Sequence, residues 1–118
     1  TEIGDFLAAL DVFVFPTVAE TFGLAAVEAA AAGIPVVATD LPVLREVLEV
    51  DGAPAALLVD TTDTPAFAAA VETIFADPAS AERLEAAGAG LARRFSLDAM
   101  VEAYARLIDE VTDRRRAA

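Results

Sequence analysis

Short, unbroken apolar segments constrain this chain most strongly, because they carry no charged side chain that would have to face water. They are residues 12–15, 35–39 and 55–59. Runs of this length are typical of strands buried on both faces, as in a parallel sheet. Helical patterns separate them, an alanine-rich one over residues 22–32 and a shorter one over 42–49. The alternation predicts a parallel sheet with right-handed crossovers.

The rest of the chain is predicted to be helical. Residues 3–10 are typical of the last turns of a helix, and Gly33 is expected to cap the helix over residues 22–32. Further helices are expected to begin where a capping residue or an early proline precedes an apolar stripe, namely at Thr64–Pro65, Asp77–Pro78 and Ser96. The apolar stripe of the helix from Thr64 consists of Phe67, Val71, Ile74 and Phe75. The last helix, which we expect to pack against the sheet, has a longer apolar stripe: Leu97, Met100, Val101, Tyr104, Leu107, Ile108 and Val111.

Three strands make a small sheet, and a parallel sheet is normally extended on both sides and covered on both faces. We therefore expect residues 1–118 to form one partial domain, the second half of a larger doubly wound α/β domain. The strand over residues 12–15 would then lie at the edge where the sheet continues. The alternative is a complete, flavodoxin-like miniature.

Composition excludes several classes of function. Twenty acidic and eight basic residues give a net charge of -12, and the sequence contains no Lys, His or Cys. Nucleic acids and anionic membranes need a basic face, so neither is an expected partner. Without His or Cys, no thiolate metal site or thiol nucleophile is possible. The chain shows no signal-peptide pattern or membrane-spanning run, so the default expectation is the cytoplasm.

The most informative segment is residues 15–37, FPTVAETFGLAAVEAAAAGIPVV. A strand ends at Phe15, a loop contains Glu20, and a helix with Glu28 inside it begins near Gly23. Ligands of open parallel sheets bind beyond the carboxyl ends of strands, where a helix start offers N–H groups to a diphosphate. The missing side chain of Gly23 would let a ligand approach the backbone, and Glu28 could accept hydrogen bonds from a vicinal diol. A solvated helix face and a packing glycine are the alternative interpretations.

Taken together, the segment resembles the nucleotide-sugar-binding motif of retaining glycosyltransferases of the GT-B fold, family 4. That motif reads Asp-x-x-x-x-Pro, Ser or Thr, Glu-x-Phe-Gly, Glu-Ala and Gly-x-Pro-Val-Val. Its positions here are Asp11, Pro16, Thr17, Glu20, Phe22, Gly23, Glu28, Ala29, Gly33, Pro35, Val36 and Val37. The resemblance extends through Asp40 and Asp51–Gly52 to the Arg94-Phe95-Ser96 step, and so covers almost the whole chain.

The resemblance implies a role for each matching residue. Glu20 would face the transferred sugar and help catalysis, while Glu28 would hold the ribose hydroxyls of the donor. The backbone amides of Phe22, Gly23 and Leu24 would contact the sugar and the diphosphate, with Thr17 as a weaker donor-binding candidate. The family implies no cofactor and no bound metal in this domain, only a nucleotide-diphosphate sugar as substrate.

The resemblance also implies parts that this chain does not contain. The family's Arg and Lys for the diphosphate come from an earlier βα segment, and its acceptor site belongs to an N-terminal domain, which would be a partner in the full-length protein. Any peripheral membrane association is expected only through such regions. The final helix of the family partly crosses to the N-terminal domain, so the alternative for the last helix of this chain is that part of its apolar stripe is left exposed. Leu41 and Pro42 replace a glycine pair that is frequent in the family, and residues 53–56 lack a frequent glycine.

Three functions therefore compete. The first is a fragment of a hexosyltransferase, inactive by itself, and the second is a non-catalytic relative in which the fold serves only interaction. The third, a dinucleotide-binding domain, is disfavoured because no Gly-x-Gly-x-x-Gly follows a strand.

Overall fold

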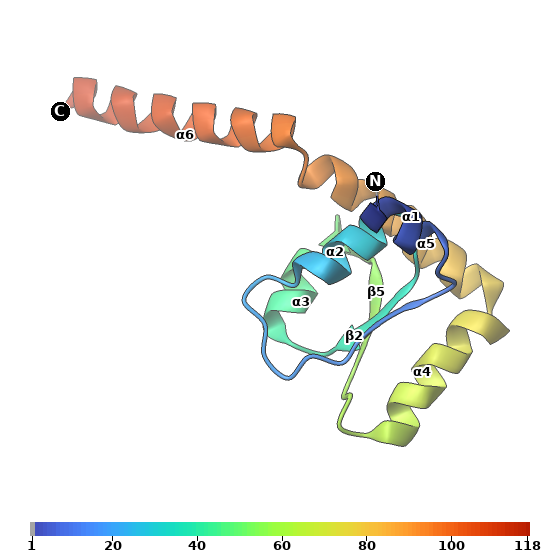
Figure 1. Ribbon diagram of the computed structural model, residues 1–118. Coiled ribbons are helices and arrows are strands. Elements are labelled where there is room, and N and C mark those ends of the chain that lie inside the picture. The colour runs from blue at the N-terminus through green and yellow to red at the C-terminus, as the bar shows by residue number, and fades with distance from the viewer. Residues whose placement is uncertain (1) are drawn as a thin grey trace.

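The computed structural model describes residues 2–118 and contains short strands alternating with helices (Figure 1). In chain order the elements are α1 Glu2–Ala8, β1 Phe13–Phe15, α2 Leu24–Ala31, β2 Val36–Thr39, α3 Pro42–Val47, β3 Glu49–Val50, β4 Ala53–Pro54, β5 Ala56–Val59, α4 Thr64–Ala76, α5 Pro78–Arg94 and α6 Leu97–Ala117.

Three parallel strands form the main sheet in the order β1-β2-β5, which confirms the predicted α/β class and places β1 at one edge. The central strand β2 is covered on both faces, with Val36, Val37 and Ala38 fully buried. The prediction that β1 is buried on both faces is wrong, because Val14 is 45% exposed. An edge strand has a neighbouring strand on one side only, and the helices that cover this sheet lie mainly over its centre.

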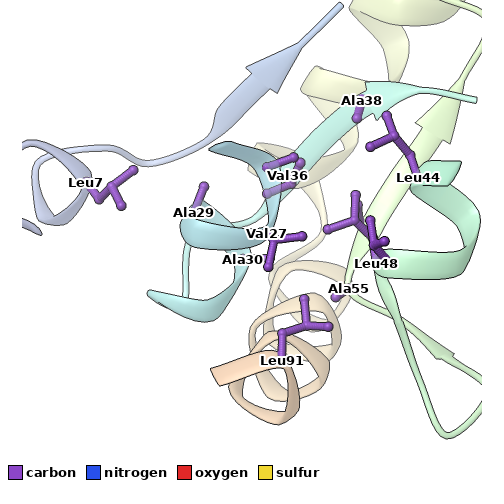
Figure 2. Close-up of a cluster of buried hydrophobic side chains, with 13 residues drawn as sticks. Leu7, Val27, Ala29, Ala30, Val36, Ala38, Leu44, Leu48, Ala55 and Leu91 are labelled. Carbon is purple, nitrogen blue, oxygen red and sulfur yellow. The ribbon is translucent and has the colours of Figure 1, made fainter. Parts of the chain in front are cut away.

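Two apolar clusters lie on opposite faces of β2, because successive strand side chains point to opposite sides. Val36 and Ala38 face the larger cluster, to which α2, α3 and α5 contribute (Figure 2). Val37 faces the smaller one, with Ala70 and Ile74 of α4. The described residues thus form the layered arrangement that parallel strands require.

Local signals account for most helix ends. Gly33 adopts φ 80°, and the N–H groups of Gly33 and Ile34 donate to the carbonyls of Ala30 and Ala29, which is the expected glycine cap of α2. The Ser96 hydroxyl accepts from the Ala99 N–H at the start of α6, as predicted. The predicted cap at Thr64 is wrong, since it is the carboxylate of Asp63 that accepts from the Ala66 N–H, at 3.1 Å.

A small hairpin of β3 and β4 was not predicted. It turns at Asp51 and Gly52, whose φ values are 52° and 81°. Positive φ at both central residues is the geometry of the type I′ turn, which favours Asp-Gly. The dipeptide was a usable signal, but each strand has only two residues and no apolar alternation.

The expectation that α6 packs against the sheet is wrong. No residue of α6, which the structure describes in full, is buried, and its apolar stripe is 45% to 70% exposed. Figure 1 shows the helix pointing away from the sheet. Phe75 of α4, and Ile3 and Phe6 of α1, are also exposed. Amphipathic spacing predicts which side of a helix is apolar, but other helices already cover both faces of the central strand β2.

Within residues 2–118, no helix is both long enough and apolar enough to cross a membrane.

Candidate functional site

The carboxyl ends of β1, β2 and β5 meet at one edge of the sheet, because the three strands are parallel. The helices α2, α3 and α4 follow these strands directly, so their N-termini lie at the same edge. A helix N-terminus carries unpaired N–H groups and a partial positive charge. This edge is therefore the place where the described chain favours an anionic ligand.

The start of α2 differs from that of α4. Asp63 supplies a carboxylate to the first turn of α4, whereas the N-cap of α2 is Gly23, which has no side chain with which to accept. The first N–H groups of α2 are thus left without a capping side chain. Leu24, the first helical residue, is 60% exposed.

Gly23 is required for two physical reasons. It adopts the left-handed conformation at φ 87° and ψ 40°, which side chains other than Asn and Asp rarely tolerate. A Cβ atom there would also overlap the Leu44 side chain, with only 2.4 Å to its Cδ2. The space that sequence reasoning reserved for a ligand is therefore filled by Leu44. The alternative interpretation of Gly23 as a packing glycine is the one this contact supports, and Gly23 itself is buried.

Glu20 lies beside this turn. Its Cγ is 3.6 Å from the Cβ position of Gly23, and its Oε1 accepts a hydrogen bond of 3.0 Å from the Thr21 N–H. The side chain is half-buried, and its second carboxylate oxygen is available to a ligand hydroxyl. The structure thus brings Glu20 and the start of α2 together.

Glu28 is exposed on α2, between buried residues on either side in sequence. It shares a helix face with Leu24, four residues earlier. Helical side chains generally lean toward the N-terminus of their helix, so the Glu28 side chain is expected to lean toward the start of α2.

Two other candidates have neighbours within the protein. The Thr17 hydroxyl donates to the Ala19 carbonyl at 2.8 Å, inside its own loop. The Phe22 ring packs edge-on against Phe95, with ring centroids 5.4 Å apart. The Phe22 side chain therefore anchors the loop, so any contact of Phe22 with a donor would come from its backbone N–H.

Sequence reasoning missed a polar group around the ends of β2 and β5. Arg45 of α3 pairs with both carboxylate oxygens of Asp40, at 2.5 and 2.6 Å, and this hydrogen bonding lowers the pKa of Asp40. The Thr39 and Thr61 hydroxyls lie 2.8 Å apart. The Asp60 carboxylate accepts from the hydroxyl and N–H of Thr62, which lowers its pKa. Asp or Thr at a strand end, with an Arg on the next helix, was the available signal.

Two cavities of about 540 and 610 Å³ flank α5 and the β3–β4 hairpin. Neither is lined by Glu20, Glu28 or the start of α2. Within residues 2–118 no cluster of three or more His, Cys, Asp or Glu side chains could hold a metal ion.

Comparison with known proteins identifies the family. Residues 1–77 match the family of glycosyl transferases group 1, and this range contains every residue of the candidate site. The chain belongs to that family. The predicted resemblance to glycosyltransferases is therefore confirmed at the level of the family.

Curated relatives agree with the family. The chain is 37% identical over 117 residues to a D-inositol 3-phosphate glycosyltransferase of Xylanimonas cellulosilytica, covering 98% of this chain and 27% of the relative. It is also 37% identical over 111 residues to a lipopolysaccharide core biosynthesis mannosyltransferase of Rhizobium meliloti, covering 94% of this chain and 31% of that protein. The chain thus spans between a quarter and a third of the length of these relatives.

A solved structure confirms the fold. Sucrose-phosphate synthase from Thermosynechococcus elongatus superposes with a TM-score of 0.74 at 32% identity, covering 92% of this chain and 27% of the synthase. That protein has the GT-B fold, so the predicted partial GT-B sheet is confirmed.

Proposed function

We propose that this chain is the nucleotide-sugar-binding part of a retaining hexosyltransferase, which moves a hexose from a nucleoside-diphosphate donor to an acceptor. One observation carries the proposal: the start of α2 has no side-chain cap, lies at the carboxyl edge of the sheet and has Glu20 beside it. Family membership supports the general activity, glycosyl transfer.

The chemistry fits a helix start. The bond between the anomeric carbon and the diphosphate oxygen breaks, and the diphosphate leaves with the electron pair. The acceptor oxygen bonds to the anomeric carbon on the face that the diphosphate vacates, and the hydroxyl proton passes to solvent. Because negative charge grows on the leaving group, the N–H groups of Phe22, Gly23 and Leu24 stabilise the transition state more than the bound donor.

The two glutamates would contact different parts of the donor. Glu20 is the catalytic candidate, because it stands at the helix start, where its free oxygen would meet the sugar hydroxyls and favour a cationic anomeric centre. Glu28 lies further along α2 and would accept two hydrogen bonds from the ribose. Thr17, at the end of β1, would be a minor contact.

The proposal includes parts outside this chain. An N-terminal domain would supply the acceptor site, and an earlier βα segment would supply Arg and Lys for the diphosphate. No metal or other cofactor is needed in this domain, and the cytoplasm is the proposed compartment. Without those parts the chain is expected to be inactive.

Substitutions in the full-length protein test the two roles. Glu28→Ala should weaken nucleotide binding by about ten- to a hundredfold, since hydrogen bonds to a charged group are worth about 1.5–3 kcal/mol. Glu20→Ala should lower kcat by more than it weakens nucleotide binding. Steady-state kinetics with direct nucleotide titration separates these effects.

Glu72→Ala is the control, because Glu72 is exposed on α4, which packs on the opposite face of the sheet from α2. It should leave both quantities unchanged. If Glu20→Ala weakened nucleotide binding while Glu28→Ala reduced only kcat, the two assignments would be reversed.

A further inference from the structure

The turn that begins α2 is supported from behind by a buried leucine. Leu44 of α3 is fully buried, and its Cδ2 reaches into the position that a Gly23 Cβ would occupy. The same position is 3.6 Å from the Cγ of Glu20. One leucine side chain therefore lies against the turn that carries both the proposed catalytic carboxylate and the proposed diphosphate amides.

Arginines hold α3, the helix that carries this leucine, at both ends. Arg45, in the last turn of α3, reaches back past the start of the helix and forms the two-pronged pair with Asp40, just after β2. At the end of α3, Arg94 Nη1 donates to the carbonyls of Glu46 and Glu49, at 3.3 and 2.8 Å. A six-residue helix has little stability by itself, so these contacts fix where Leu44 stands.

The other side of the turn is tied to the same arginine. The Arg94 guanidinium lies over the Phe95 ring, 5.1 Å from its centroid. Phe95 in turn contacts the Phe22 ring, edge-on. The turn of residues 20–23 thus contacts Leu44 through Gly23 and Phe95 through Phe22, and Arg94 contacts both Phe95 and the end of α3.

We propose that Leu44 is a positioning residue for the donor site. Its side chain fills the space that Gly23 leaves open and so sets where Glu20 and the first N–H groups of α2 stand. This inference rests on the proposed function for its consequence, but the contact itself is independent of any ligand. Binding groups need placement within about 0.5 Å, and such placement depends on a packed supporting shell.

Leu48 provides a matched control. It is a leucine of the same cluster, four residues further along the chain, and it is 2% exposed (Figure 2). None of its atoms is among the three nearest to the Gly23 Cβ position. Leu44→Ala and Leu48→Ala both remove the same number of buried carbons. A purely structural role predicts the same effects for both substitutions.

The first experiment needs no ligand and uses the 118-residue chain. Leu44→Ala should shift the backbone amide resonances of residues 20–24, whereas Leu48→Ala should leave them close to wild type. Gly23→Ala should destabilise the fold, and adding Leu44→Ala should recover part of that loss, since it removes the overlapping side chain. Additive effects of Gly23→Ala and Leu44→Ala on the unfolding midpoint would overturn the proposal. Should Leu44→Ala fail to fold, Leu44→Val carries the same comparison with a smaller truncation.

The second experiment measures UDP and GDP binding by the full-length protein. Leu44→Ala should weaken binding of the preferred nucleotide by roughly tenfold, as is usual for loss of a supporting residue behind a ligand group. Leu44→Met should restore binding, and Leu48→Ala should not weaken it. Equal losses for Leu44→Ala and Leu48→Ala would overturn the positioning role while leaving the proposed function intact. If the wild-type protein bound neither nucleotide, the proposed function would fail. The ligand-free experiment would still show whether Leu44 positions the turn of residues 20–23.

Discussion

At the scale of single residues, Asp40 and Arg45 show how a strand end and the following helix are joined. Asp40 follows β2, and Arg45 reaches back from the last turn of α3 to both carboxylate oxygens of Asp40. Because Arg45 is exposed and Asp40 only half-buried, solvent screens the attraction, and the main effect of the pair is on geometry rather than stability. It orients α3, and through α3 it orients Leu44.

The same pair makes a prediction about pH. The hydrogen bond from Arg45 lowers the pKa of Asp40, so any stabilisation from the pair is complete above the ordinary Asp pKa, near 3.9, and is lost as the pH falls through the lowered value. Arg45→Met should return the pKa of Asp40 toward its ordinary value. Carboxyl ¹³C NMR titration measures this directly.

Asp60 is the internal control in that titration. Thr62 is the main cause of its lowered pKa, so the pKa of Asp60 should not respond to Arg45→Met. A parallel rise at both residues would mean that Arg45 acts through the general charge of the protein and not through the bond to Asp40.

At the scale of elements, small residues set how closely α2 and α5 pack. Gly88 of α5 lies against the backbone of Ala30 in α2, and a Cβ at position 88 would come within 2.1 Å of the Ala30 carbonyl oxygen. Gly90 allows a similar approach of Val50 from the hairpin. The two glycines weaken the intrinsic helix propensity of α5 but allow α5 to pack closely against α2 and the hairpin.

Gly88→Ala tests this balance. On an exposed helix surface the change would stabilise a protein by up to about 1 kcal/mol, but here it should destabilise the chain by about 1–3 kcal/mol, because α2 and α5 must separate. Urea unfolding followed by circular dichroism gives the difference. The matched control is Ala89→Gly, at an exposed position on the same turn of α5, which should cost up to about 1 kcal/mol through propensity alone. A higher urea midpoint for Gly88→Ala would show that the helices are not in close contact.

At the scale of the whole molecule, charge opposes the proposed ligand. The chain has a net charge of -12, so it repels a nucleoside diphosphate at long range. A helix N-terminus contributes only about 0.3–1 kcal/mol at an exposed site. The 118-residue chain should therefore bind sugar nucleotides very weakly and transfer no sugar.

Titration calorimetry of the 118-residue chain with UDP- and GDP-linked sugars checks this expectation. We expect no measurable heat at micromolar concentrations. Micromolar affinity would contradict the view that cationic residues outside this chain are needed for the diphosphate.

The sequence by itself determined the family, the order of the helices and of the three parallel strands, and the position of β1 at the edge of the sheet, because unbroken apolar runs, caps and glycines act over a few neighbouring residues. It also placed Glu20 beside the start of α2. Only the tertiary structure decided that Leu44 fills the space at Gly23, that Arg45 and Arg94 hold α3, and that the stripe of α6 stays exposed. These contacts join residues whose proximity depends on how whole elements pack, and the spacing of apolar residues within one helix carries no information about its neighbour.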